Sequence, residues 1–409
     1  MAVAVLFTLV WFPLIGFAVS RLAGRMNVFL AGAGVNGLVL FVAGLLHLPL
    51  IPVLFCLGLT SLLVIVRWSG LRAALVSRPR LPDLLFAIAA LTLLFVSAIT
   101  PLDDFDGRAF WLLKAKAIAH EGSLDGPFFQ GQSTFSPRNE YPLLVPLDAA
   151  TIMTVAGELD ERTVRWLYAM FAIGLALEVR RRAGPWYGAL VLWLPQVAMG
   201  PEGGALTAYS DIALAAFAAC AFFELTSDDP GALRFGLWLS FLVLTKNEGL
   251  PFALILLAIG AVVFRARIIV SAIPAGAAIA ALLVWRSRIE PTDDNRYILE
   301  DIPKRLDRIG EVLITLGRNT VAFADWGVFW IAVLGAALLL AAWRQWRPLL
   351  IGAAAIVPML AIELMMYLAS DWITVDLVNA TAPRLLTHFI GPGMYLLAYA
   401  NQQDHRRNA

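Results

Sequence analysis

Residues 83–106 read DLLFAIAALTLLFVSAITPLDDFD, an apolar run that ends at a proline and a group of aspartates. The apolar part, 83–100, has the length of a helix that crosses a bilayer. Similar runs recur along the 409 residues, of which 60% are hydrophobic and 15% are charged. Soluble domains carry about 25% charged residues. The sequence therefore predicts an all-α polytopic membrane protein surrounded by a lipid bilayer.

Hydropathy predicts about thirteen membrane-spanning helices. Their expected positions are 3–20, 28–47, 50–66, 83–100, 164–179, 185–199, 206–225, 233–245, 249–264, 268–286, 326–343, 348–368 and 385–400. The stretch 142–157 is apolar but short, and it contains Asp148 and two prolines. We interpret it as a half-membrane or surface-lying helix.

Arginine clusters predict the orientation, because short cytoplasmic loops are rich in Lys and Arg. With alternating spans, the clusters fall on one side if the N-terminus is outside and the C-terminus inside. Two long loops, 101–163 and 288–325, then lie outside. In the first we expect a helix from Asp106 to His120 that ends at Gly122. In the second, an apolar face at helical spacing predicts an amphipathic helix lying on the membrane. This face consists of Ile302, Leu306, Ile309, Leu313 and Leu316.

Several classes of function are disfavoured by composition. A net charge of +1 and the lack of a basic, aromatic-rich patch argue against a nucleic-acid partner. Cys56 and Cys220 lie in apolar runs without CxxC spacing, so they indicate neither a disulfide framework nor a zinc site. The sequence also contains no GxxxxGK[ST] nucleotide motif.

Four polar groups are expected on the outer face. They are Asp103, Asp104 and Asp106; Tyr209, Ser210 and Asp211; Lys246 and Glu248; and Arg384 and His388. Each has an ordinary structural explanation, because aspartate caps helices and basic side chains snorkel at interfaces. Together they suit chemistry on a lipid-linked anion, with a carboxylate as general base and cations beside a departing phosphate.

The order of these motifs resembles the GT-C-fold membrane glycosyltransferases, which take sugars from polyprenyl-phosphate donors. The resemblance covers residues 83–400 and rests on five features. They are DDFDGRAFWLLKAKAIAHEG (103–122), EYPLLVP (140–146), AYSD (208–211), KNEG (246–249) and Arg384 before the last span. Residues 286–383 match only in general layout. Three expected spans precede the motif-bearing one, whereas many family members begin with it.

The resemblance implies a GT-C-like module over 83–409, preceded by N-terminal transmembrane helices over 1–82. It implies an inverting sugar transfer with Asp106 as base and Asp104 as its nearest rival, and a supporting role for Asp103. Residues expected to support the acceptor or a metal are Asp211, Tyr209 and Glu140. Residues expected near the donor phosphate are Arg384, Lys246, Lys114 and His388. A divalent cation, Mg or Mn, would use Asp104 and Asp211.

The resemblance also implies a multi-pass protein of a bacterial inner membrane whose site faces the periplasm. The acceptor would be an envelope glycan such as lipopolysaccharide, a lipid or a protein. Two other functions remain open. A transporter or flippase of lipid-linked glycans would use an ionisable residue inside a span, for which Glu363 is the candidate. A non-catalytic assembly subunit would need none of these side chains.

Overall fold

The computed structural model describes residues 2–67, 80–102, 104–131, 138–289, 298–370 and 374–408, and the regular elements of these residues are helices. The N-terminal part contains α1 (Ala2–Ala23), α2 (Val28–Leu45), α3 (Leu50–Arg67), α4 (Leu81–Ile99), a π-helical segment η1 (Gly107–Leu112), α5 (Leu113–Glu121) and α6 (Leu144–Ala156). The middle part contains η2 (Glu161–Thr163), α7 (Arg165–Ala183), α8 (Pro185–Trp193), α9 (Pro195–Met199), α10 (Asp211–Leu225), α11 (Ala232–Thr245), α12 (Gly249–Phe264), η3 (Arg265–Arg267) and α13 (Ile268–Arg288). The C-terminal part contains η4 (Leu299–Arg308), α14 (Ile309–Thr320), α15 (Phe323–Trp326), α16 (Phe329–Ala342), α17 (Trp346–Ala369), α18 (Thr374–Thr387) and α19 (Ile390–Asn408).

Among the described residues, six helical segments are long and apolar enough to cross a membrane. They are α1, α2, α3, α4, the 40-residue run of α12 to α13, and α17. Shorter apolar helices, α6, α11 and α16, lie among them. These segments support the expected multi-pass membrane protein, whereas the full set of thirteen spans stays a prediction.

Three expected spans begin or continue differently in the structure. The run 185–199 forms two helices, α8 and α9, because Leu194 is extended and Pro195, which follows it, has no N–H to donate to a continuing helix. The run 206–225 is helical only from Asp211. The run 385–400 is divided between the end of α18 and the start of α19, with His388 at the junction.

The N-terminal helices belong to the same packed core as the rest of the chain. α1 and α2 pack backbone to backbone, because a Cβ on Gly16 would lie 1.6 Å from Val28 O. Buried Asn36 of α2 donates to Asp148 Oδ1 of α6 at 2.9 Å. Residues 144–153 of α6 are all buried, so α6 is internal to the bundle. This contradicts the expectation of a surface-lying helix, whereas a half-membrane helix stays a prediction. The amide of Asn36 also donates to Thr151 Oγ1 at 3.1 Å, so one side chain of α2 contacts two polar residues of α6.

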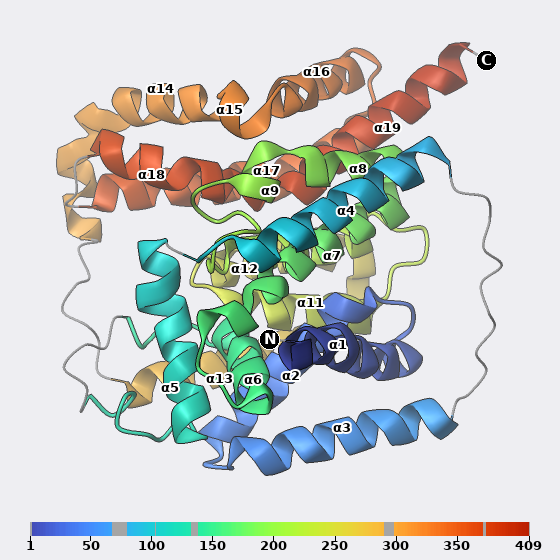
Figure 1. The fold of residues 1–409 in the computed structure, drawn as a ribbon. Helices are drawn as coiled ribbons and strands as arrows, with labels where there is room; N and C mark the ends of the chain where they lie inside the picture. The colour runs from blue at the N-terminus through green and yellow to red at the C-terminus, as the bar shows by residue number, and fades with distance from the viewer. Residues whose placement is uncertain are drawn as a thin grey trace.

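The amphipathic pattern of 302–316 forms η4 and α14, but only part of its apolar face is available to a membrane. Ile302, Ile309 and Leu316 pack with residues of α17 and α18 in a small apolar cluster. Leu306 and Leu313 are about half exposed. The expected helix is therefore present, and it packs mainly on the protein. In Figure 1, α14, α15 and α16 run along the upper edge and α3 along the lower edge.

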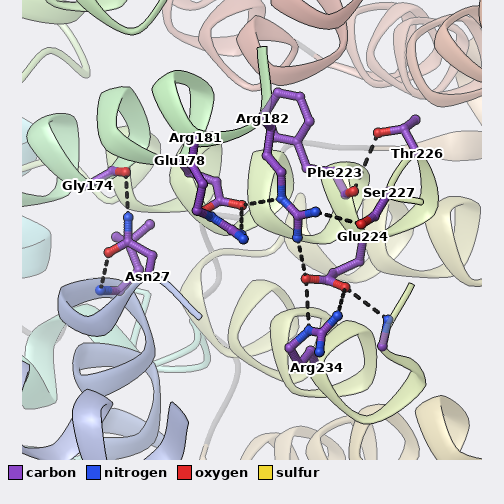
Figure 2. A network of polar contacts seen from close by, with 12 residues as sticks. Asn27, Gly174, Glu178, Arg181, Arg182, Phe223, Glu224, Thr226, Ser227 and Arg234 are labelled. Carbon is purple, nitrogen blue, oxygen red and sulfur yellow. Dashed lines mark hydrogen bonds and ion pairs between the residues drawn. The ribbon is translucent and has the colours of Figure 1, made fainter. Parts of the chain in front are cut away.

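Helix α10 runs through the centre of the core, since all of its residues are buried. Its C-terminal end carries a charge network (Figure 2) in which Glu224 accepts hydrogen bonds from Arg182 and Arg234. Arg182 also donates to Glu178, so the network ties α7, α10 and α11 together. The N-terminal end of α10, about 20 Å away at 1.5 Å per residue, carries Asp211 and the polar groups described next.

Candidate functional site

Asp211, the first residue of α10, lies at the centre of a buried polar cluster. Its Oδ1 accepts a hydrogen bond from Lys246 Nζ at 2.8 Å and lies 3.2 Å from His388 Nε2. All three side chains are almost fully buried. They come from α10, from the turn after α11 and from the junction of α18 and α19. The structure therefore brings together three of the expected site residues.

Lys246 lies between two carboxylates, because its Nζ is also 2.8 Å from Glu248 Oε1. Burial alone would lower the pKa of Lys246, but the negative charges of Asp211 and Glu248 reverse this and raise the pKa above its usual value. The ammonium is therefore a firmly charged counter-ion for two acids. The expectation that Lys246 meets a donor phosphate stays a prediction.

Asp104 and Asp106 have different surroundings. Asp104 Oδ1 accepts from Gly107 N at 2.7 Å, and its Oδ2 accepts from Ala208 N at 3.3 Å. It therefore caps η1 and ties the first loop to the segment before α10. Asp106 Oδ2 faces Arg384 Nη1 at 3.5 Å, and its side chain is 35% exposed. Asp103 lies outside the described residues.

Arg384 is the basic residue that joins these two groups of acids. Its guanidinium lies over the ring of Tyr209, 5.2 Å from the centroid. It interacts electrostatically with Asp211, Asp106 and Glu202. Burial raises the pKa of Glu202, which comes from the loop before α10. We call Asp104, Asp106, Glu202, Asp211 and Glu248 the carboxylate cluster.

The loop that supplies Glu202 approaches the site closely at Gly203. The backbone φ of Gly203 is +78°, a value that residues other than glycine rarely adopt. A Cβ at this position would lie 2.8 Å from the Cβ of Arg384 and 3.1 Å from the Cβ of Asp211. Glycine is therefore needed here both for backbone conformation and for space.

Several polar atoms of the site are buried and have no hydrogen-bond partner among the described residues. They are Ser210 Oγ, Asp211 Oδ2, Glu248 Oε2, Arg384 Nε and His388 Nδ1. Buried polar groups are normally satisfied, and exceptions concentrate where a protein meets a ligand or water. The concentration of five such atoms around the N-terminal end of α10 makes this region the candidate site for a polar molecule.

Lys114 and Glu140 lie apart from Asp211, in a second polar group. Lys114 is fully buried, and its Nζ donates to Arg138 O at 2.7 Å. The ammonium also lies over the rings of Trp111 and Tyr141, 5.4 and 5.2 Å from their centroids. Burial lowers the pKa of Lys114 to about 7, although nearby Glu140 opposes this effect.

Sequence reasoning missed Glu202, Arg138 and Arg286, and it gave Glu363 a different role. Glu363 is buried within α17 and interacts electrostatically with Glu248, Lys246 and Asp211, so it belongs beside the site. Arg286 could have been found from the sequence, because it is a basic residue at the expected outer end of the span 268–286. The same logic had singled out Lys246. Glu202 had no such signal beyond its adjacent glycines.

The surroundings of Asp104 and Asp211 do not fit a divalent cation bound between the two carboxylates. Lys246 and His388 already occupy one oxygen of Asp211, and backbone N–H groups occupy both oxygens of Asp104. Within the part of the chain that the structure describes, no group of three or more His, Cys, Asp or Glu side chains is placed to hold a metal ion. The proposals below therefore use only the chain's own residues.

Comparison of the chain with family models, curated proteins and solved structures finds no match in any of the three. The geometry of the site therefore carries the functional argument.

Proposed function

We propose that this protein is a membrane glycosyltransferase that transfers a sugar from a polyprenyl-phosphate donor to an acceptor hydroxyl. The observation that carries the proposal is the approach of Asp106 to Arg384, 278 residues further along the chain. This pair lies beside the buried cluster of Asp211, Lys246 and His388. A partly exposed carboxylate in a polar, buried surrounding is suited to take a proton from a hydroxyl.

In the proposed reaction, Asp106 accepts the proton of the acceptor hydroxyl as its oxygen attacks the anomeric carbon. The bond between that carbon and the phosphate oxygen breaks, and its electron pair leaves with the polyprenyl phosphate. A single displacement of this kind inverts the anomeric configuration. Asp104 shapes the loop that presents Asp106, because its carboxylate holds η1 and the segment before α10. Arg384 orients Asp106 and limits repulsion within the carboxylate cluster.

The supporting observations favour one reaction site over a transport path. Glu363, the residue expected to serve a transporter, lies next to Lys246 and Glu248 and so extends the same cluster. The long apolar helices provide the bilayer contact that a lipid-linked donor requires. A GT-C fold and a bacterial inner-membrane location with a periplasmic site agree with this arrangement and are part of the proposal.

The test is a cell strain that lacks the protein, complemented with wild type, Asp106→Asn or Asp104→Asn. Mass spectrometry of the envelope glycans should show a missing sugar that wild type restores and Asp106→Asn does not. Asp125→Asn is the matched control, because it makes the same charge change in the same loop at a partly exposed side chain. Full restoration by both Asp106→Asn and Asp104→Asn would reject the proposal. Movement of intact lipid-linked sugar across proteoliposomes without transfer would favour the flippase.

A further inference from the structure

A second cluster, which we call the basic cluster, consists of Lys114, Arg138 and Arg286. Arg286 of α13 donates from Nη2 to Asn247 Oδ1 at 2.6 Å, within the turn that also carries Lys246 and Glu248. Arg138 donates from Nη1 to the hydroxyl of Tyr141 at 2.7 Å. Arg286 interacts electrostatically with Tyr141 and Glu140. Glu140 acts electrostatically on both Lys114 and Arg286, and Glu248 acts on Tyr141, so basic side chains outnumber acids in this region.

The two clusters have opposite charge, which bears on where an anionic donor binds. The carboxylate cluster contains five acids around Arg384 and Lys246, and each of these cations is already paired with an acid. A phosphate placed there would be repelled by the surrounding carboxylates. The basic cluster has the complementary charge.

The geometry of an inverting transfer leads to the same assignment. The attacking oxygen and the leaving oxygen lie on opposite faces of the sugar, and in inverting glycosidases the groups that serve them are about 6.5–9.5 Å apart. Arg384 lies 3.5 Å from Asp106, so it is on the side of the base. The leaving phosphate needs a cation on the opposite side.

Arg138 contacts the helical segment that follows Asp106. Phe110, four residues after Asp106, lies in the π-helical segment η1. The guanidinium of Arg138 lies over the Phe110 ring, 5.8 Å from its centroid. Arg138 also has a φ of +51°, a strained conformation for a residue with a side chain. Lys114 stabilises this turn through its bond to the Arg138 carbonyl.

We propose that the basic cluster binds the phosphate of the polyprenyl donor, with Arg138 and Arg286 as the contacting residues. This inference rests on the proposed function and names the part of the site that takes the lipid-linked anion. Arg138 and Arg286 donate to the phosphate oxygens and stabilise the charge that develops as the sugar leaves. The Nε of Arg286 is buried and has no hydrogen-bond partner among the described residues, so it is available to the phosphate. Lys114 is a positioning residue that holds Arg138.

The test compares the binding of undecaprenyl phosphate with that of undecaprenol, which has the same chain without the phosphate. The full-length protein in nanodiscs is titrated with each lipid, and tryptophan fluorescence is measured. We expect wild type to prefer the phosphate about tenfold or more, the value of at least one charge-assisted hydrogen bond. Arg138→Gln and Arg286→Gln should remove most of this preference and leave undecaprenol binding unchanged.

Two further sets of variants make the result decisive. Arg138→Lys and Arg286→Lys keep the charge and should retain part of the preference, which also guards against variants that fail to fold. Arg318→Gln is the matched control on α14, because its side chain is exposed. If Arg138→Gln and Arg286→Gln keep the preference while Arg384→Gln loses it, the phosphate lies at the carboxylate cluster and the inference is wrong. If wild type has no preference, the proposed function is also wrong.

Discussion

Asp211 and Lys246 form a buried ion pair, 2.8 Å long, that joins the first residue of α10 to the residue following α11. The lysine also contacts Glu248 at 2.8 Å, so one ammonium serves two carboxylates. Buried charges are tolerated when they are paired, and removal of one partner leaves an uncompensated charge in a poorly solvated place. Loss of the Lys246 charge should therefore destabilise the protein more than loss of the Asp211 charge.

We predict that Lys246→Met destabilises the protein more than Asp211→Asn. The first change leaves the buried carboxylate of Asp211 and the partly buried carboxylate of Glu248 without their shared cation, a loss on the order of 3–5 kcal/mol. The second leaves Lys246 paired with Glu248. Thermal unfolding in detergent measures the difference, and adding Glu248→Gln to Lys246→Met should recover part of the loss. Lys304→Met is the control, because its side chain is 75% exposed and such pairs contribute about 0–1 kcal/mol. Equal losses from Lys246→Met and Lys304→Met would contradict the prediction.

Gly203→Ala is predicted to impair sugar transfer more than it impairs folding. The new Cβ would displace Arg384 and Asp211, which it would approach at 2.8 and 3.1 Å. Gly157→Ala is a control with a similar φ of +69° and open space around its Cβ, so it tests backbone strain alone. Strain of this kind costs about 1–2 kcal/mol. The measurement is transfer activity beside the melting temperature. Activity that falls equally in both variants would show that strain alone is responsible.

Lys114 should give the protein a pH-dependent stability. Its pKa falls from 10.5 in the unfolded chain to about 7 in the folded one. Between these values the unfolded chain binds the extra proton, so stability rises with pH across this window and is lower at pH 7 and below. Lys114→Met removes the titrating group. Melting temperatures from pH 7 to pH 10 should therefore rise more steeply for wild type than for the variant, and parallel curves would contradict the assignment.

Membrane character and local helix endings were predictable because they depend on short stretches of sequence. The apolar run 83–100 forms α4. Gly122 ends α5 in the left-handed conformation expected of a C-cap. Asp106, Asp211, Lys246, Arg384 and His388 were expected on one face, and the structure places them in one connected cluster.

The pairing of those residues was not predictable, because it depends on packing between distant helices. A pair between Lys246 and nearby Glu248 could be foreseen from the sequence, but the sequence does not reveal that Asp211 of α10 binds the same ammonium. Nor does it reveal that α6 is internal, since its burial depends on Asn36 of α2. Nor does it reveal that the guanidinium of Arg138 lies over the ring of Phe110 in η1.

The charge network at the far end of α10 should support stability without taking part in donor recognition. Glu224 is almost fully buried, and it accepts hydrogen bonds from Arg182 and Arg234 (Figure 2). It also accepts one from the backbone N–H of Gly231. Glu224→Gln leaves Arg234 without its carboxylate partner and Arg182 with Glu178 alone, so we predict a loss on the order of 3 kcal/mol. Asp228→Asn, the same charge change at an exposed side chain of the adjoining loop, should have little effect. Thermal unfolding measures both variants.

The same variant also tests whether the two ends of α10 act independently. Glu224 lies about 20 Å along α10 from Asp211, and α10 is held at each end by a separate group of charges. Glu224→Gln protein that remains folded at low temperature should therefore keep the preference of wild type for undecaprenyl phosphate over undecaprenol. If the preference disappears while the melting temperature changes little, the network controls the site through α10, and independence of the two ends is rejected.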